Sequence, residues 1–175
     1  MSVTLVQIAP PRTAPAATSQ RRIGEVTVRP ARITDMAQVE PIIAGFAARN
    51  LMLPKSREQL VRCFREFAVA TDGKRVLACG GLRIFSETLG EIVSLAVTEE
   101  AHGLGVGGRI VERLVDDARA LELSTVFALT LRDNFFHRLG FRTVPKEDFP
   151  LKVWADCRSC PKLHACDEIA VAMEI

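Results

Sequence analysis

The sequence predicts a single mixed α/β (α+β) domain, with a central, mostly antiparallel sheet of about six to seven strands flanked by about four helices. Its 175 residues, of which 48% are hydrophobic, fit one domain with an ample core. Short apolar runs bounded by turn residues are typical of strands. One long amphipathic stretch after a glycine-rich loop indicates a helix.

The N-terminal segment differs in composition from the rest of the chain. Residues 1–23 are rich in Pro, Ala, Thr and Ser, and they include Arg21 and Arg22. Such a segment cannot bury enough apolar surface to order itself, so we expect a flexible tail before a folded domain at residues 24–175. Because the tail contains no acidic residue, a transit peptide is the alternative.

The first ordered elements are expected to be a strand at residues 25–29 and a helix at residues 34–43, which begins with a capping residue three positions before Gln38. A second helix start is clearer. Ser56 and Gln59 have the spacing of a capping box, in which each side chain bonds to the backbone amide of the other residue.

A meander of three strands is expected next. Residues 67–70 and 75–85 are apolar runs separated by an Asp72-Gly73 pair, which favours a tight turn and hence an antiparallel hairpin. A third run, residues 91–97, adds another antiparallel strand just before the glycine-rich segment.

The helix expected at residues 105–121 has its apolar side chains on one stripe. These are Ile110, Val111, Leu114, Val115, Ala118 and Leu121. The order of the remaining elements is then a buried strand at 125–131, a short helix at 135–139 ended by Gly140, and a closing strand at 166–174.

Charge and hydropathy exclude several classes of partner. The formal net charge is only +2, with basic and acidic residues interspersed, so the sequence predicts no nucleic-acid surface. No apolar run reaches the roughly 20 residues of a membrane helix, and the N-terminus lacks the order of a secretory signal. We therefore expect a cytoplasmic protein with a small-molecule substrate; a homodimer is possible, because the sequence leaves the oligomeric state open.

The segment from Leu95 to Gly108 is the most informative for function. A strand runs into a loop and then a helix, with four glycines within six residues, Gly103 to Gly108. Glycines let backbone amides approach a phosphate closely, and a helix N-terminus favours negative charge. The segment therefore predicts a pyrophosphate-bearing ligand. It lacks the Gly-Lys-Ser/Thr of a triphosphate loop, and it follows a meander instead of opening the first βαβ unit.

This segment resembles motif A of the GNAT superfamily of N-acetyltransferases, in which Arg or Gln, two residues, Gly, one residue and Gly or Ala wrap the pyrophosphate of coenzyme A. His102 occupies the Arg/Gln position, with Gly105 and Gly107 as the matched glycines. The resemblance implies the GNAT fold over the ordered chain and acetyl-CoA as cosubstrate. It also implies a pyrophosphate site made by the following residues: His102, Gly103, Leu104, Gly105, Val106, Gly107 and Gly108.

The resemblance also assigns a role to the strand before the loop. In the family this strand separates from its neighbour at a bulge, and its backbone pairs with the pantetheine arm like an added strand. Leu95, Ala96 and Val97 take those positions here. An amide of this backbone would stabilise the oxyanion formed at the thioester.

Glu91 is the candidate general base. An α-amino group with a pKa of about 8 is mostly protonated at neutral pH, so attack on a thioester needs a base. Glu91 is the only ionisable side chain in residues 91–97, and it could act directly or through a water. The alternative is an exposed acid just after a turn. Residues 91–93 also resemble the strand that carries the glutamate base in histone acetyltransferases of this superfamily.

The general acid has no obvious candidate. Many family members have a tyrosine four residues before the Gly of the Gly-Phe pair, but this chain contains no tyrosine and has Phe136 there. Either a water or another group protonates the sulfur, or coenzyme A leaves as a thiolate. The adjacent His137 is interpreted as a surface residue.

A narrower resemblance is to the acetyltransferase domain of N-acetylglutamate synthases, especially the form without a kinase domain. It covers residues 53–60, 89–97 and 126–141 in patches, and it implies an amino-acid substrate. A dicarboxylate needs at least two cations, for which the candidates are Lys55, Arg57 and Arg132; solvated surface charges are the alternative.

The functional hypothesis is therefore acetylation of the α-amino group of L-glutamate, the first step of arginine biosynthesis. The alternatives are acetylation of another amine, such as glutamine, a polyamine or a protein lysine, and a non-catalytic acetyl-CoA sensor.

Four possible soft ligands lie close together near the C-terminus, namely Cys157, Cys160, His164 and Cys166. Tetrahedral zinc needs such a set, but the spacing lacks the paired Cys-x-x-Cys knuckles of zinc ribbons, so buried or free thiols are the alternative. The other two cysteines, Cys63 and Cys79, are expected in the core.

Overall fold

The computed structural model describes residues 25–149 and 165–175. Its strands are β1 (Thr27–Pro30), β2 (Phe67–Thr71), β3 (Val76–Ile84), β4 (Leu89–Val97), β5 (Thr125–Thr130), β6 (Arg142–Thr143) and β7 (Ile169–Glu174). Its α-helices are α1 (Met36–Ala47), α2 (Arg57–Arg62), α3 (Val106–Ala120) and α4 (Asp133–His137). Short 3-10 turns are η1 (Ile33–Asp35), η2 (Phe64–Glu66), η3 (Glu99–Ala101) and η4 (Lys146–Asp148).

The strands form one sheet of seven, in the order β1-β2-β3-β4-β5-β7-β6. Among these described strands only β4 and β5 pair in parallel, and every other neighbouring pair is antiparallel. This confirms the predicted fold class. The sequence did not indicate β6, which is only two residues long and lies on the edge.

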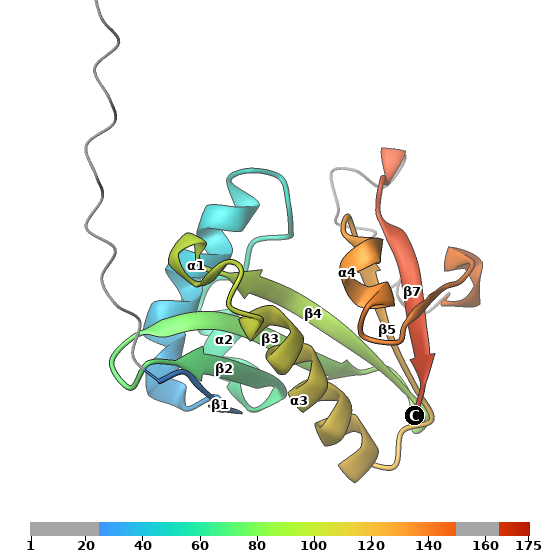
Figure 1. The fold of residues 1–175 in the computed structure, drawn as a ribbon, viewed down its shortest axis with the longest axis horizontal. Helices are drawn as coiled ribbons and strands as arrows, with labels where there is room; N and C mark the ends of the chain where they lie inside the picture. The colour runs from blue at the N-terminus through green and yellow to red at the C-terminus, as the bar shows by residue number, and fades with distance from the viewer. Residues whose placement is uncertain (1–24, 150–164) are drawn as a thin grey trace, which may run out of the picture.

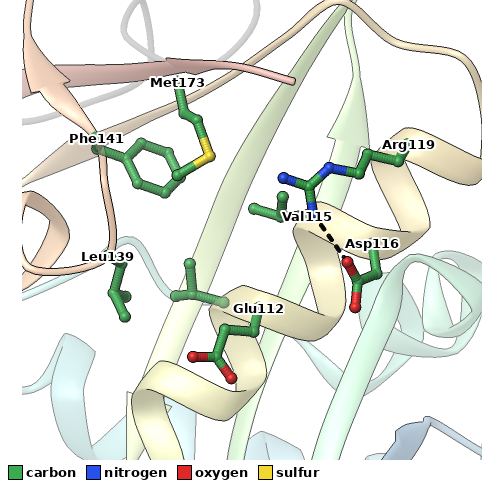
Figure 2. Close-up of a pocket in the computed structure, with 8 residues that line it drawn as sticks. Glu112, Val115, Asp116, Arg119, Leu139, Phe141 and Met173 are labelled. Carbon is green, nitrogen blue, oxygen red and sulfur yellow. Dashed lines mark hydrogen bonds and ion pairs between the residues drawn. The ribbon is translucent and has the colours of Figure 1, made fainter.

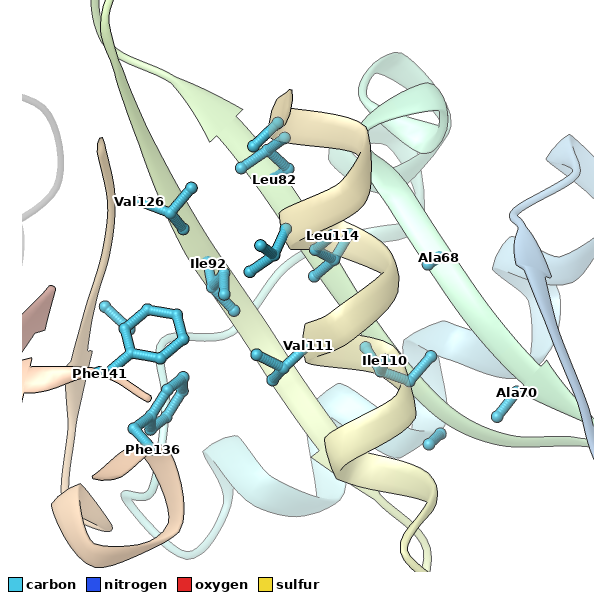
Figure 3. Close-up of a cluster of buried hydrophobic side chains, with 14 of the residues drawn as sticks. Ala68, Ala70, Leu82, Ile92, Ile110, Val111, Leu114, Val126, Phe136 and Phe141 are labelled. Atoms are coloured by element: carbon cyan, nitrogen blue, oxygen red, sulfur yellow. The ribbon is translucent and has the colours of Figure 1, made fainter. Parts of the chain in front are cut away.

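The helices cover both faces of the sheet. Helix α3 lies across one face, while α1 and α2 pack on the opposite face (Figure 1). In the core under α3, Ile110, Val111 and Leu114 point towards side chains of the sheet (Figure 3). Gly80 lets α3 come this close, because a Cβ there would lie 2.8 Å from Cγ2 of Ile110.

The end of the α3 stripe was predicted wrongly. The helix ends at Ala120, and the Leu121 side chain is 58% exposed. The chain turns at Leu121, where the backbone leaves helical geometry, so the residue no longer follows the helical period. Ala118 is thus the last buried residue of the stripe.

The start of α1 also differs from its predicted cap. Asp35 makes no side-chain cap; its carboxylate accepts hydrogen bonds from the Arg29 guanidinium at 2.7 Å and from the Arg32 amide at 2.7 Å. The bond from Arg29 holds the pKa of the buried Asp35 carboxyl below its ordinary value. Gln38 accepts a hydrogen bond from the Val76 amide instead. The bonds to Arg29 and Val76 fasten the start of α1 to β1 and β3, while the bond from the Arg32 amide closes the start of η1.

Two other local predictions are confirmed. The Ser56 hydroxyl accepts from the Gln59 amide and the Gln59 side chain accepts from the Ser56 amide, so α2 begins with a capping box. Strands β2 and β3 form the predicted hairpin. Asp72 stabilises its turn by accepting from the amides of Lys74 and Arg75. No helix in the described part of the chain is long and apolar enough to cross a membrane.

Strands β4 and β5 pair only over their first three residues, the last pair being Glu91 with Phe127. Beyond it β5 continues along β7, and β4 continues along β3, so the two strands separate (Figure 1). A bulge lies in the separated part of β4, where Ser94 and Leu95 face the single residue Gly80 of β3. Ser94 has a φ of 54°, a left-handed conformation that costs a non-glycine residue about 1–2 kcal/mol.

The packing of α3 predicts a large loss of stability for one Leu-to-Ala substitution and almost none for another. Leu114→Ala removes a side chain that is 1% exposed, so it should lower the free energy of unfolding by about 2–5 kcal/mol. Leu121→Ala, at the exposed residue just after the same helix, should change it by less than about 0.5 kcal/mol. Chemical denaturation of both variants measures the difference, and equal losses would contradict this assignment of the core.

Candidate functional site

Glu91 lies at the point where β4 and β5 separate, and its side chain is buried. The residue is 2% exposed, so the alternative of an exposed acid after a turn is wrong. It lies directly opposite Arg83 of β3 and beside Phe127 of β5. Facing residues of neighbouring strands point to the same side of the sheet. The carboxylate therefore has a cation on one side and an aromatic ring on the other.

The face on which Glu91 lies follows from the alternation of β4. Ile92 packs in the core under α3, so Glu91 points to the face that carries α1 and α2. On this face the Phe127 ring stacks on Phe149, with 4.1 Å between the ring centroids and an angle of 5° between the planes. This stack forms an apolar wall beside Glu91.

The separated part of β4 provides a backbone edge. In the described part of the chain, no strand pairs with residues 92–97 on the side that faces away from β3. An extended ligand can add to such an edge through main-chain hydrogen bonds. The geometry fits the strand-like pairing predicted for Leu95, Ala96 and Val97, and the bulge at Ser94 re-aims the backbone groups next to Glu91.

The glycine loop leads from β4 into α3. Gly103 and Gly105 have φ values of 79° and 70°, and a Cβ at either position would meet nothing within 4 Å. The first hydrogen bond of the helix runs from the Arg109 amide to the Gly105 carbonyl at 3.2 Å. The amides before Arg109 lack intrahelical acceptors, and no side chain caps the helix. This arrangement fits a diphosphate.

The last two glycines of the loop, unlike the first two, lie close to neighbouring side chains. A Cβ on Gly107 would lie 3.3 Å from Cγ2 of Val97, and one on Gly108 would lie 3.5 Å from Cδ2 of Leu139. These glycines therefore let α3 approach the end of β4 and the segment after α4. The loop combines an open pair, at 103 and 105, with a packed pair, at 107 and 108.

His102 braces the loop. Its Nε2 donates a hydrogen bond to the Val97 carbonyl at 3.0 Å, which joins the loop to the end of β4. The neighbouring Thr98 hydroxyl oxygen is buried and has no hydrogen-bond partner among the described residues. Leu104 at the tip of the loop is 52% exposed. The loop is thus fixed to the end of β4 by His102, while its tip at Leu104 stays exposed to solvent.

The three predicted substrate-binding cations lie in different surroundings. Lys55 is half-buried just before α2, and Arg132 is exposed where β5 ends and α4 begins. Arg57 forms an ion pair with Glu40 of α1 at 2.6 Å. The Arg57 guanidinium already has an anionic partner, whereas no ion pair is found for Lys55 or Arg132 within the described residues.

Two further charged residues, which the sequence analysis did not identify, are Arg83 and Glu66. The charge of Glu66 interacts with those of Arg83 and Lys55. Turn η2, which ends at Glu66, contacts β3, the strand that carries Arg83. Desolvation raises the pKa of the Glu66 carboxyl, and the charges of Arg83 and Lys55 oppose that rise. The pKa of the Cys63 thiol is also raised, first by burial and then by Glu66. The register of the β3–β4 hairpin was the signal that could have placed Arg83 opposite Glu91.

The position of the family tyrosine is part of the core. Phe136 is 4% exposed and makes edge contacts with Phe135 and Phe141, each with 5.2 Å between ring centroids. The exposed His137 contacts the Thr143 hydroxyl at 2.9 Å, as expected for a surface histidine. The Phe136 side chain therefore has no proton to donate to the sulfur.

Most of the predicted zinc set, Cys157, Cys160 and His164, lies outside the described residues. Cys166 is half-buried, and its sulfur lies 3.5 Å from Nζ of Lys146. No group of potential metal ligands occurs within residues 25–149 and 165–175. Cys79 is in the core as predicted, where burial raises the pKa of its thiol to about 12, while Cys63 is only half-buried.

A separate groove of about 300 Å³ lies between α3 and the segment that joins α4 to β6 (Figure 2). Its apolar lining includes Val115, Phe141 and Met173, and Asp116 and Arg119, which form an ion pair at 3.0 Å, also line it. None of the predicted site residues lines this groove. It lies on the α3 side of the sheet, opposite to the face of Glu91.

The comparison with known proteins agrees with this geometry. The model of the acetyltransferase (GNAT) family matches residues 36–141, which contain α1, the glycine loop and α3. The chain belongs to this family. It is accordingly an acetyl-CoA-dependent N-acetyltransferase, and the predicted cosubstrate is confirmed.

The similarity to individual members of the family is more specific. The chain is 39% identical to an uncharacterized N-acetyltransferase of Chlorobaculum tepidum, over 84% of this chain and 95% of the relative. It is 35% identical to an amino-acid acetyltransferase of Mycobacterium tuberculosis, over 75% of this chain and 78% of the relative. The structure of N-acetylglutamate synthase from Neisseria gonorrhoeae, complexed with coenzyme A and N-acetyl-glutamate, matches with a TM-score of 0.77 and 27% identity. That match covers 86% of this chain and 35% of the synthase chain.

The open pair of glycines can be tested with a matched substitution. Gly105→Ala adds a methyl group on the predicted phosphate side and strains a residue with positive φ, so it should weaken acetyl-CoA binding about tenfold or more. Gly73→Ala introduces a similar strain, at a φ of 89°, in the β2–β3 turn. It should lower stability without changing acetyl-CoA affinity. Calorimetric titration that finds equal affinities for the two variants would remove Gly105 from the site.

Proposed function

We propose that this protein transfers the acetyl group of acetyl-CoA to the α-amino group of L-glutamate, with Glu91 as general base. The observation that carries the proposal is the buried carboxylate of Glu91 at the separation of β4 and β5, opposite Arg83. The similarity to an amino-acid acetyltransferase and to an N-acetylglutamate synthase supports the substrate. In this role the enzyme would supply the first step of arginine biosynthesis.

In the proposed reaction Glu91 takes a proton from the substrate ammonium, directly or through a water. The neutral amine then attacks the thioester carbonyl and an N–C bond forms. The nitrogen loses its second proton to water, and the C–S bond breaks as the electron pair leaves with sulfur. A backbone amide of residues 95–97 stabilises the intermediate oxyanion. Because Phe136 cannot donate a proton, the thiolate is protonated by water or leaves as such.

Substrate recognition in this proposal requires cations on the face of Glu91. Arg83 lies opposite Glu91, and Lys55 is close enough for its charge to act on the same groups, Glu66 and Cys63. Arg132 lies at the end of β5, the other strand of the separated pair. We assign the two substrate carboxylates to this set. Arg57 is retained as a candidate only if its ion pair with Glu40 opens.

The role of Glu91 can be tested by Glu91→Gln, which keeps the shape of the side chain and removes the base. Turnover at neutral pH should fall about 10²- to 10⁴-fold, while acetyl-CoA affinity stays within about twofold. Raising the pH should restore part of the rate, because a larger fraction of the amine is then neutral. Glu87→Gln, in the exposed β3–β4 turn, is the control and should keep full activity. Equal pH–rate profiles of wild type and Glu91→Gln would exclude Glu91 as the base.

The substrate can be tested by measuring coenzyme A release with glutamate, glutamine, lysine, spermidine and a histone-like peptide. We expect the highest kcat/KM with glutamate. Lys55→Met should raise the KM for glutamate about 10- to 100-fold with little change in kcat, since it removes a charged hydrogen bond to a carboxylate. Lys74→Met, in the exposed β2–β3 turn, should leave KM unchanged. Preference for spermidine or the peptide would refute the glutamate assignment.

A further inference from the structure

The 3-10 turn η3 places two carboxylates directly before the glycine loop. Glu99 and Glu100 are both exposed, and Glu100 lies three residues before Gly103. Three residues of chain span at most about 11 Å, which is close to the Debye length of about 10 Å at 0.1 M salt. A charge at this distance is not fully screened, so an unpaired carboxylate on η3 would repel a diphosphate in the loop.

Arg75, in the turn between β2 and β3, pairs with the second of these carboxylates. Its Nη1 donates to both carboxylate oxygens of Glu100, at 2.9 and 2.8 Å. Its Nε and Nη2 donate to one oxygen of Asp72, at 3.2 and 3.0 Å. Asp72 is held in turn by the backbone amides of Lys74 and Arg75. All three guanidinium nitrogens are thus in use, so Glu100 is joined to a fixed partner on the hairpin.

The other side-chain contacts of η3 are weaker. Thr98 occupies the N-cap position, but its hydroxyl does not cap the turn, and the buried oxygen has no hydrogen-bond partner among the described residues. Arg49, just after α1, lies 3.7 Å from Glu99, whose side chain is 86% exposed, so solvent screens this pair strongly. Within the described part of the chain, the contact between Arg75 and Glu100 is therefore the shortest polar side-chain contact of η3.

We propose that Arg75 is a positioning residue for the cosubstrate, which acts by pairing the Glu100 carboxylate so that η3 adds no unpaired negative charge beside the diphosphate. This inference rests on the assignment of the glycine loop to the diphosphate. It goes beyond the proposed function, because it holds whichever amine is acetylated. In this role the β2–β3 hairpin assists cosubstrate binding through η3.

The test is calorimetric titration of coenzyme A into the full chain at two salt concentrations. At about 0.02 M salt, where the Debye length is about 20 Å, Arg75→Gln should bind coenzyme A about three- to tenfold more weakly than wild type, because Glu100 is then unpaired. At about 0.5 M salt the difference should shrink to less than about twofold, since charges are then screened within a few ångströms. Arg75→Lys keeps the charge and should bind within about twofold of wild type at both concentrations.

A double variant separates the effect of charge from that of structure. Arg75→Gln combined with Glu100→Gln lacks both charges, so its affinity at low salt should return to within about twofold of wild type. If Arg75 only held η3 in place, the double variant would bind as weakly as Arg75→Gln. The matched control is Arg119→Gln, because Arg119 pairs with Asp116 at 3.0 Å near the opposite end of α3. This control should keep the affinity of wild type.

Four results would overturn the proposal: unchanged affinity in Arg75→Gln, a loss that persists in the double variant, a loss of equal size at both salt concentrations, or an equal loss in Arg119→Gln. Arg75→Met, which removes the charge but keeps a long side chain, takes the place of Arg75→Gln if that variant does not fold. Unchanged affinity in Gly105→Ala would show that the loop does not hold the diphosphate, and the role of Arg75 would fail with it. Because coenzyme A binding needs no amine, none of these results depends on the proposed substrate.

Discussion

The separation of β4 from β5 after Glu91 is the constraint on which the rest of the structure depends. A continuous sheet would pair every main-chain group of both strands and leave no edge for a ligand. Here β5 pairs with β7 up to Thr130, while β4 pairs beyond Glu91 only with β3 among the residues that the structure describes. The bulge at Ser94, with its left-handed backbone, lies in the same stretch. A strained residue persists only where its surroundings hold it, and such residues cluster at functional sites.

The same separation explains how one short strand could serve two ligands. The backbone edge of β4 leads towards the glycine loop and the N-terminus of α3, which fit the diphosphate of acetyl-CoA. The Glu91 side chain leaves β4 on the opposite face, next to Arg83 and the Phe127–Phe149 stack. Cosubstrate and amine would then approach from different sides of the sheet and meet where the strands separate, since direct transfer requires the reacting atoms to lie close together.

Periodicity and capping signals predicted much of this fold. The stripe of α3, the capping box at Ser56 and the β2–β3 hairpin depend on residues close together in sequence, and the structure confirms them. Asp35 was misjudged because its partner Arg29 lies on a different element, where local patterns give no information. The two-residue β6 is too short to produce a period at all.

The candidate site was predictable to a similar extent. The glycine loop and Glu91 are neighbours along the chain, so their pattern could be read directly. Arg83 lies opposite Glu91 only through the β3–β4 register, and η2, which ends at Glu66, packs on β3 only in the folded chain. The burial of Glu91 likewise depends on β5, which lies beside it only in the folded chain. The local sequence around Glu91 therefore could not predict it.

Hydrogen–deuterium exchange with and without acetyl-CoA tests the central claim, that the free edge of β4 and the glycine loop bind the cosubstrate together. The account predicts that acetyl-CoA slows exchange of backbone amides in residues 92–97 and 103–108. It predicts no change in the groove lined by Val115, Phe141 and Met173. Slowed exchange at that groove, with none along β4 or the loop, would contradict it.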